Sequence, residues 1–159
     1  MTNQPVGMLD SGLGGISVLA QALRDCPRED YVYFGDTANI PYGDKEPEEV
    51  LRLTRLGVDK LTAHGCKAIV IACNTASVTA LELLRKNYSI PFVGVVPAIK
   101  PAGLLSRNKT IGLFATNKTV SQAYTQNLID SFASECKVRR FAMPEIVSCP
   151  GCGRTDPPI

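Results

Sequence analysis

The sequence lacks several features that would point to large or charged partners. It has no tryptophan, one histidine and no apolar run near the roughly 20 residues that a membrane-spanning helix needs. Its 17 basic and 15 acidic residues leave a formal charge of +2 and form no basic block, so nothing favours nucleic acid or an anionic membrane. A secretory signal pattern is also missing from its first residues. We therefore expect a cytoplasmic protein whose partner is a small molecule.

What the chain does have is enough apolar sequence for a sizeable core. Its 159 residues are 45% hydrophobic and 20% charged, as in ordinary globular domains. It contains six cysteines, which we expect to be reduced in a chain of this length without a signal peptide. Free cysteines usually behave as small buried hydrophobes, so Cys26, Cys66 and Cys136 are expected to be structural or incidental.

Short apolar runs alternate with stretches of helical periodicity along most of the chain. The runs predict strands at residues 5–9, 31–34, 68–72, 92–96 and 110–115, and the periodic stretches predict helices at 16–23, 48–64, 77–85 and 119–132. This alternation indicates an α/β fold with parallel sheets and helices on both faces.

A proline-rich segment interrupts this pattern near the middle of the chain. Pro97 and Pro101 are expected to stop regular structure there. We therefore predict one α/β domain at residues 1–96, the start of a second at 97–143, and an atypical tail rich in Cys, Pro and Gly at 144–159.

Polar residues follow several of the predicted strands. Because the carboxyl ends of parallel strands meet at one edge of a sheet, these loops are expected to converge where open α/β folds bind ligands. The loops are Asp10-Ser11, Pro41-Tyr42-Gly43, Cys73-Asn74-Thr75 and Thr116–Thr119.

The glycine-rich turn at residues 10–15 could be mistaken for a phosphate-binding loop. It has neither the G-x-G-x-x-G spacing nor a Gly-Lys-Ser/Thr motif, which makes a nucleotide site improbable by pattern. The helix that follows presents free N–H groups suited to a carboxylate. Alternatively, Asp10 or Ser11 simply caps that helix.

Cys73 is open to two interpretations. It comes at the end of a buried strand and opens a helix, a position that lowers a thiol pKa and raises its reactivity. From its position alone, an inert packed cysteine is the favoured interpretation, because cysteines at strand ends commonly just pack. A Cys–His pair is not expected, because His64 should lie at the opposite end of the strand, about 17 Å away for five residues.

Six segments occur in the order and spacing found in one enzyme family. They are Leu9–Gly15, Tyr33–Asp36, Pro41–Gly43, Ala72–Ala76, Gly94–Ala98 and Gly112–Val120. The chain thus resembles glutamate racemases, within the aspartate/glutamate racemase superfamily, from about residue 6 to about residue 132. The resemblance implies two flavodoxin-like parallel-sheet domains, with the second domain and the chain's return to the first truncated here.

The resemblance also implies an activity and the residues that carry it. Such enzymes interconvert L- and D-glutamate for peptidoglycan synthesis, without a cofactor or metal, by proton transfer between two thiols. Cys73 would be one thiol, assisted by Asp10, and a homodimer is expected. The implied substrate-binding residues are Asp10, Ser11, Pro41, Tyr42, Gly43, Asn74, Thr75 and Thr119.

The second thiol of this family comes from a later Gly-Cys-Thr-His-like motif, which the sequence does not contain. Cys149 and Cys152 lack the Thr-His that should follow, so neither takes that role. Their loop instead resembles the cluster loop of the iron–sulfur hydroxymethylbutenyl diphosphate synthase over about a dozen residues, a match that we attribute to a chance tail or a joined sequence end. An aspartate racemase-like enzyme and a non-catalytic amino-acid-binding fragment remain alternatives.

Overall fold

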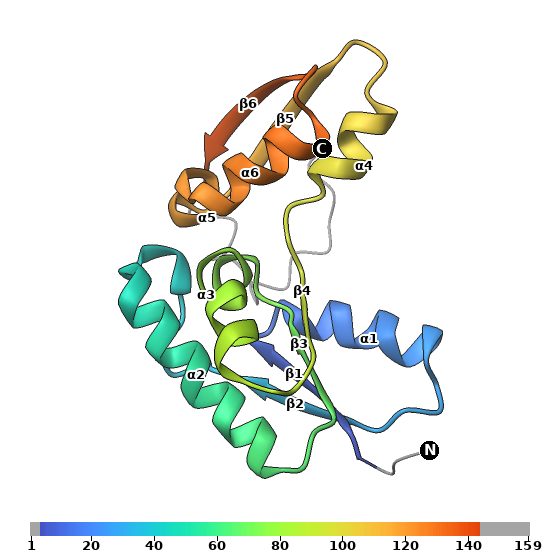
Figure 1. The fold of residues 1–159 in the computed structure, drawn as a ribbon, viewed down its shortest axis with the longest axis vertical. Helices are drawn as coiled ribbons and strands as arrows, with labels where there is room; N and C mark the ends of the chain where they lie inside the picture. The colour runs from blue at the N-terminus through green and yellow to red at the C-terminus, as the bar shows by residue number, and fades with distance from the viewer. Residues whose placement is uncertain (1–3, 144–159) are drawn as a thin grey trace, which may run out of the picture.

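The computed structural model describes residues 4–143, which form two parallel sheets with helices packed against them (Figure 1). The first sheet has the strand order β2-β1-β3-β4, and the second pairs β5 with β6. The elements in chain order are β1 (Val6–Asp10), α1 (Gly15–Asp25), β2 (Tyr31–Gly35), the 3₁₀ turn η1 (Tyr42–Asp44), α2 (Pro47–Ala63), β3 (Ala68–Ile71), α3 (Asn74–Asn87), β4 (Phe92–Gly94), α4 (Ile99–Leu105), β5 (Thr110–Ala115), α5 (Asn117–Ser121), α6 (Ala123–Phe132) and β6 (Lys137–Ala142). The predicted α/β class with parallel sheets is confirmed.

The first sheet carries helices on both faces, α1 on one and α2 with α3 on the other (Figure 1). The central strand β1 is buried on both sides, since the neighbouring residues Met8 and Leu9 point to opposite faces and are both fully buried. Gly57 lets α2 approach closely, because a Cβ there would lie 2.4 Å from a methyl group of Leu9. Strand β1 pairs in register with β2 and β3, so Asp10 comes at the carboxyl edge of the sheet.

Helix α2 spans nearly the predicted range 48–64, and the residues at its two ends suit a helix start and a helix end. Pro47 stands at its first turn and Glu48 and Glu49 follow, which suits the positive end of the helix dipole. His64 is the C-terminal cap, and Gly65 follows with a φ of +75°, a left-handed conformation that favours glycine. The expected structural position of His64 at a helix end is therefore confirmed.

The second sheet has its own core, formed by α4 and α6 against β5 and β6. Ile99, Ile111, Leu113 and Ile129 are its main buried side chains. The expectation that Pro97 and Pro101 stop regular structure was wrong for Pro101. Pro101 is the third residue of α4, and the first turn of a helix needs no intrahelical partner for its N–H, so proline fits there.

Other elements differ from their predicted limits. Helix α3 begins at Asn74 rather than at residue 77, strand β4 ends at Gly94 rather than at 96, and β6 was not predicted. Gln122, in extended conformation, divides the helix expected over 119–132 into α5 and α6. Strand β6 escaped detection because its residues are mostly exposed and two arginines break any apolar alternation.

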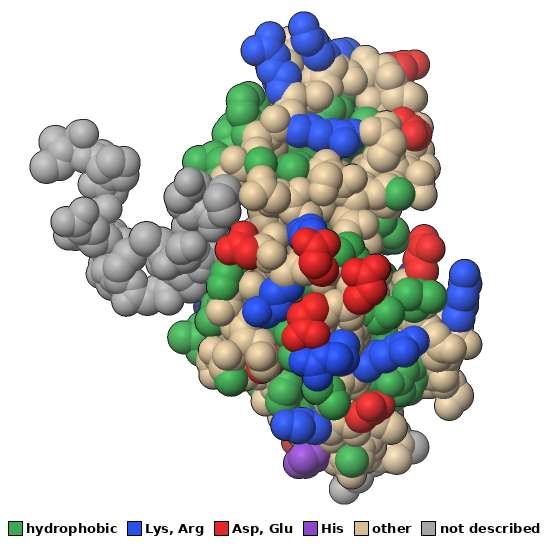
Figure 2. Space-filling model, turned by 90° about the vertical axis from the view of Figure 1, so that its left-hand side faces the viewer, with side chains coloured by type: hydrophobic (Ala, Val, Ile, Leu, Met, Phe, Trp, Pro, Cys, Tyr) green, Lys and Arg blue, Asp and Glu red, His purple; other side chains and the backbone are tan. Residues whose placement is uncertain are grey.

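The surface of the described residues carries mixed charges, with acidic and basic side chains side by side near the middle of the face shown in Figure 2. The face of the second sheet opposite Ile111 and Leu113 exposes a stacked aromatic pair, Phe114 and Phe141, with ring centroids 4.8 Å apart. None of the helices in residues 4–143 combines the length and apolar character needed to cross a membrane.

Candidate active site

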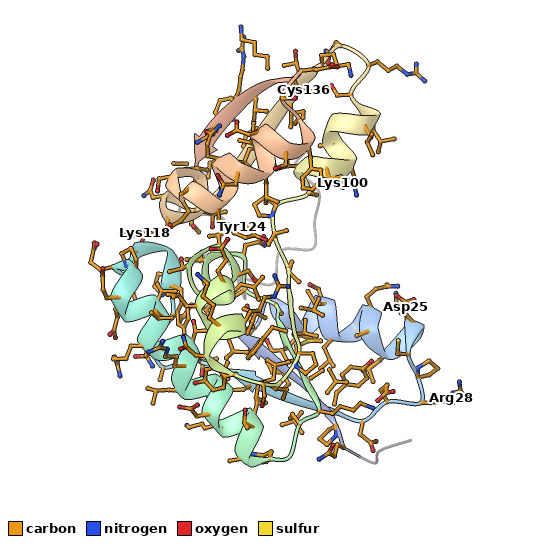
Figure 3. The ribbon with its side chains drawn as sticks, in the orientation of Figure 1. Asp25, Arg28, Lys100, Lys118, Tyr124 and Cys136 are labelled. Atoms are coloured by element: carbon orange, nitrogen blue, oxygen red, sulfur yellow. The ribbon has the colours of Figure 1, made fainter. Side chains whose placement is uncertain are left out.

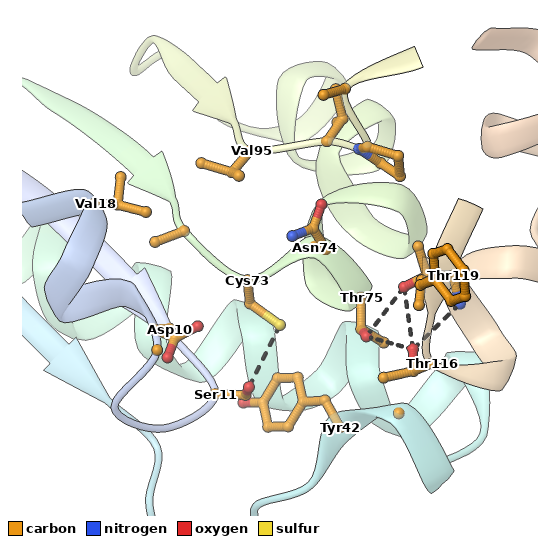
Figure 4. A pocket seen from close by; sticks show the side chains of 18 of the residues that line it. Asp10, Ser11, Val18, Tyr42, Cys73, Asn74, Thr75, Val95, Thr116 and Thr119 are labelled. Atoms are coloured by element: carbon orange, nitrogen blue, oxygen red, sulfur yellow. Dashed lines mark hydrogen bonds between the residues drawn. The ribbon is translucent and has the colours of Figure 1, made fainter. Parts of the chain in front are cut away.

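A cleft of about 710 Å³ lies between the carboxyl edge of the first sheet and the second α/β unit. Its polar lining comes from loops that are distant in sequence but follow strands, as the topology predicted. Figure 4 shows these side chains around the cleft. Of the residues implied by the resemblance, those that line it are Asp10, Ser11, Tyr42, Gly43, Cys73, Asn74, Thr75 and Thr119. Pro41 does not line the cleft; it follows Ile40 through a cis peptide bond and comes just before Tyr42.

Cys73 is the N-cap residue of α3 and is 7% exposed. Its Sγ lies 3.4 Å from the Ser11 hydroxyl and accepts a hydrogen bond from the Ala76 N–H at 3.4 Å. Burial raises the pKa of the Cys73 thiol, and the nearby Asp10 carboxylate raises it further, while the contacts with Ser11 and Ala76 oppose the rise. The expectation that the helix N-terminus lowers the pKa of Cys73 was therefore wrong, because burial outweighs the contacts with Ser11 and Ala76 that favour the thiolate.

Asp10 closes the turn before α1. Its Oδ2 atom accepts hydrogen bonds from the N–H groups of Gly12 and Gly15, at 3.1 and 3.0 Å. The Tyr33 hydroxyl lies 2.9 Å from the Gly12 carbonyl and 3.4 Å from the same Oδ2. The N-cap residue of α1 is Gly14, which has no side-chain cap bond, and Asp10 instead binds the first residue of the helix through the Gly15 N–H. Any chemical role of Asp10 must use the rest of its carboxylate.

The N-terminus of α3 supplies the helix end that faces the cleft. This helix has 14 residues, and the N–H groups of its first turn have no intrahelical partners. Cys73 occupies one of them through Ala76, and Asn74 and Thr75 stand beside it in the cleft wall. An anionic group placed here would meet backbone donors and the positive end of the helix dipole.

Three buried threonines join the two α/β units across the cleft. The Thr75 hydroxyl lies 3.1 Å from that of Thr116 and 3.3 Å from that of Thr119, and the latter two are 3.1 Å apart (Figure 4). Thr116 also caps α5 by accepting from the Thr119 N–H. Sequence reasoning marked the loop but did not assign Thr116, although its position before a helix was a usable N-cap signal.

The loop before α2 forms the opposite wall. Tyr42 is 1% exposed, and its hydroxyl donates to Asp36 Oδ2 at 2.8 Å, so this proton is not directed at the cleft. Gly43 packs so closely on the second unit that a Cβ there would lie 2.8 Å from Thr116. Outside the cleft, Lys118 reaches across to Glu46 at 3.2 Å (Figure 3). Both contacts hold the two units against each other.

The other cysteines of the described part do not line the cleft. Cys26, Cys66 and Cys136 are free thiols elsewhere in the fold; Cys66 is buried and Cys136 partly buried, as expected for structural cysteines, whereas Cys26 is exposed. Within residues 4–143, no three His, Cys, Asp or Glu side chains come together as metal ligands would. Cys149 and Cys152, whose loop resembles an iron–sulfur ligand loop, lie outside the described residues.

The cleft combines a thiol that caps a helix, a carboxylate and hydroxyl groups at the edge of a parallel sheet. Comparison with known proteins identifies the family in which this arrangement occurs. A model of Asp/Glu/Hydantoin racemases matches residues 10–147. The chain belongs to this racemase family. Glutamate racemase of Shewanella denitrificans is 47% identical over 144 residues, and that of Clostridium acetobutylicum is 42% identical over 146. These alignments cover 90% and 91% of this chain but 52% and 57% of the relatives, so the chain spans about half their length.

Solved racemase structures share the fold. A glutamate racemase isoform of Bacillus anthracis superposes with a TM-score of 0.85 at 32% identity, and the Escherichia coli glutamate racemase in complex with L-glutamate with 0.83 at 38%. Each comparison covers 91% of this chain and 55% of the other. An aspartate racemase homologue from Pyrococcus horikoshii, at 16% identity and a TM-score of 0.55, shares the fold alone. The expected racemase fold is confirmed over the part of these structures that the chain covers.

Proposed function

We propose that this chain carries one thiol half-site of a glutamate racemase, in which Cys73 exchanges the α-proton of glutamate. The observation that carries the proposal is the Cys73 thiol, buried at the N-terminus of α3 and facing a cleft shared with Asp10 and Ser11. Relatives at 42–47% identity named glutamate racemase support the choice of substrate.

In the proposed reaction the Cys73 thiolate removes the α-proton and becomes a thiol, and the C–H electron pair moves onto the α-carboxylate as an enolate. That charge develops where the first N–H groups of α3 and the hydroxyl of Thr75 could stabilise it. Ser11, 3.4 Å from the sulfur, would donate to the thiolate while it is charged. Returning the proton to the same face gives exchange, and racemisation needs a second acid on the other face.

Asp10 and the threonines complete the proposed assignment. We assign to Asp10 the movement of protons near Cys73, together with binding of the amino group, because its carboxylate raises the pKa of the thiol and lines the cleft. Ser11, Asn74, Thr75, Thr119 and the loop at Pro41-Tyr42-Gly43 are assigned to substrate binding, with Thr116 added. Tyr42 would act through its ring and backbone, since its hydroxyl donates to Asp36.

Two alternatives are kept for the test to decide. An aspartate racemase-like enzyme would use the same thiol on a shorter acid, although Asp10-Ser11 with Pro41-Tyr42-Gly43 favours glutamate. A non-catalytic amino-acid-binding fragment would hold glutamate without exchanging its α-proton. The observation that favours this alternative is that the chain spans only about half the length of its relatives.

The deciding experiment follows α-proton exchange by NMR in heavy water, with L-glutamate, D-glutamate and both aspartates in separate tubes. We expect deuterium to enter one glutamate enantiomer much faster than the other, because one thiol serves one face. Exchange of aspartate instead would support the alternative enzyme, and binding without any exchange would leave a binding fragment.

The exchange rate should rise with pH. Burial raises the pKa of Cys73, so the thiol is mostly protonated at pH 7 and the reactive thiolate increases about tenfold per pH unit below that pKa. We expect the rate to climb from pH 7 past the ordinary thiol pKa of about 8.5 without reaching a plateau there. A plateau already at pH 7 would mean that the thiol is not the base.

We further propose that the chain forms a homodimer through exposed apolar surface. Phe141 is 41% exposed and stacks on Phe114, which lines the cleft and is itself 56% exposed, and association would cover both rings. Light scattering should give about twice the 17.1 kDa chain mass, and Phe141→Asp should lower it toward one chain. A monodisperse monomer at micromolar concentration would contradict this proposal.

The free cysteines and the family resemblance support a proposal for the biological setting. The free thiols of Cys26, Cys66, Cys73 and Cys136 suit a reducing compartment, which supports a cytoplasmic location. There the reaction would supply D-glutamate for peptidoglycan, the role implied by resemblance to glutamate racemases.

A further inference from the structure

Asp36 is a buried carboxylate that does not line the cleft, yet it is tied to two of its walls. It follows β2 directly, and its N–H donates to the Asp10 carbonyl at 2.9 Å. Its side chain accepts from the Tyr42 hydroxyl at 2.8 Å and from the Asn39 amide at 2.8 and 3.0 Å. At 9% exposure the carboxylate has little water to replace these donors.

The partner of Asp36 is among the most deeply buried side chains of the molecule. Tyr42 packs in the same apolar cluster as Cys73 and Ala76, so its ring is part of the thiol's surroundings. Burial first, and then the bond to Asp36, raises the pKa of Tyr42, which keeps it a phenol that donates. A phenol at this depth without an acceptor would be costly, and the loop would have to shift to reach water.

We propose that Asp36 is a positioning residue that fixes Tyr42, and through Tyr42 the wall of the glutamate site formed by Ile40, Tyr42 and Gly43. Asp36 lies outside the cleft lining and acts on bound substrate only through that wall. The inference rests on the proposed function for its ligand. Its structural half, that Asp36 sets the position of Tyr42, can be tested without any ligand.

Two substitutions of Asp36 differ in whether they keep a hydrogen-bond acceptor for Tyr42. Asp36→Ala removes every acceptor from Tyr42 and Asn39. Asp36→Asn keeps one carbonyl oxygen at nearly the same place, so it can still accept from Tyr42 while losing part of the Asn39 interaction. A positioning role therefore predicts that asparagine rescues what alanine loses.

The chain contains a matched pair for comparison. On the surface of α2, Asp59 accepts from the Tyr88 hydroxyl at 2.7 Å, the same chemistry at nearly the same distance. Neither residue lines the cleft. Asp59→Ala thus removes an Asp–Tyr hydrogen bond without touching the wall, and it controls for the general effect of such a loss.

The test uses the whole chain labelled with ¹³Cζ-tyrosine, with the Tyr42 and Tyr88 resonances assigned from Tyr42→Phe and Tyr88→Phe. Calorimetric titration with L- and D-glutamate gives the affinity of each variant, and circular dichroism confirms folding. We expect Asp36→Ala to shift the Tyr42 resonance and weaken glutamate binding about tenfold, the cost of one unpaired buried group. Asp36→Asn should restore both readouts, and Asp59→Ala should shift only Tyr88.

The outcomes are distinguishable. An unshifted Tyr42 resonance in folded Asp36→Ala overturns the proposal, as does unchanged glutamate affinity when the resonance has shifted. If the unmodified chain binds no glutamate, the proposed function fails, and the Tyr42 resonance alone still decides whether Asp36 positions that side chain. If Asp36→Ala does not fold, Asp36→Asn carries the test: a Tyr42 resonance far from its unmodified position would overturn the rescue.

Discussion

Replacing Cys73 with alanine is expected to lower α-proton exchange on the favoured glutamate enantiomer by roughly 10²–10⁴-fold, the usual contribution of a positioned acid or base. The thiol is the acid/base group of the cleft with the geometry for this step, since it caps α3 and lies against Ser11. Exchange should be measured by NMR in heavy water at pH 8, where more of the thiol is ionised.

Cys66→Ala is the matched control for that variant. Cys66 is also a buried free thiol whose pKa is raised by burial. It lies outside the cleft, against Gly7 of β1, where a Cβ on the glycine would come within 3.1 Å of the sulfur. This variant should keep exchange within a few-fold of the unmodified chain. Equal loss in both cysteine variants would show that exchange depends on packing rather than on the Cys73 thiol, and full exchange in Cys73→Ala would refute the assignment.

Replacing Asp10 should affect stability and chemistry separately. Asp10→Ala leaves the N–H groups of Gly12 and Gly15 without their acceptor, which should lower the free energy of unfolding by about 1–3 kcal/mol. Asp10→Asn keeps an oxygen in place and should retain most of that stability. Both variants remove the carboxylate beside Cys73, and we expect exchange to fall about 100-fold in each.

Urea denaturation and NMR exchange together check this prediction. Asp25→Ala provides the control, because Asp25 ends the same helix, is exposed and accepts from Gln21. Its loss should change the free energy of unfolding by less than about 0.5 kcal/mol, as is usual for surface substitutions, and should leave exchange intact. Normal exchange in a stable Asp10→Asn variant would limit Asp10 to binding the N–H groups at the start of α1.

Sequence periodicity was informative where burial is two-sided. The run at residues 68–72 predicted β3 because a strand covered on both faces is apolar throughout. Ile69 and Ile71 are fully buried on one face, and Val70 is half-buried on the other. Strand β6 was missed because most of its residues are exposed. Helix α4 was missed because Pro101 in its first turn was interpreted as a break, although proline is tolerated at that position. The domain limit expected between residues 96 and 97 stays a prediction.

The sequence alone determined that polar loops after parallel strands meet at one sheet edge, because strand and helix periods specify the layer order and with it the position of Asp10, Cys73 and Thr119. Only the tertiary structure decided which atoms pair: Cys73 with Ser11 across 62 positions, and Thr75 with Thr116 across 41. It also turned the Tyr42 hydroxyl toward Asp36. A hydroxyl or thiol accepts many partners, so its choice depends on the packing of distant elements, which no local pattern encodes.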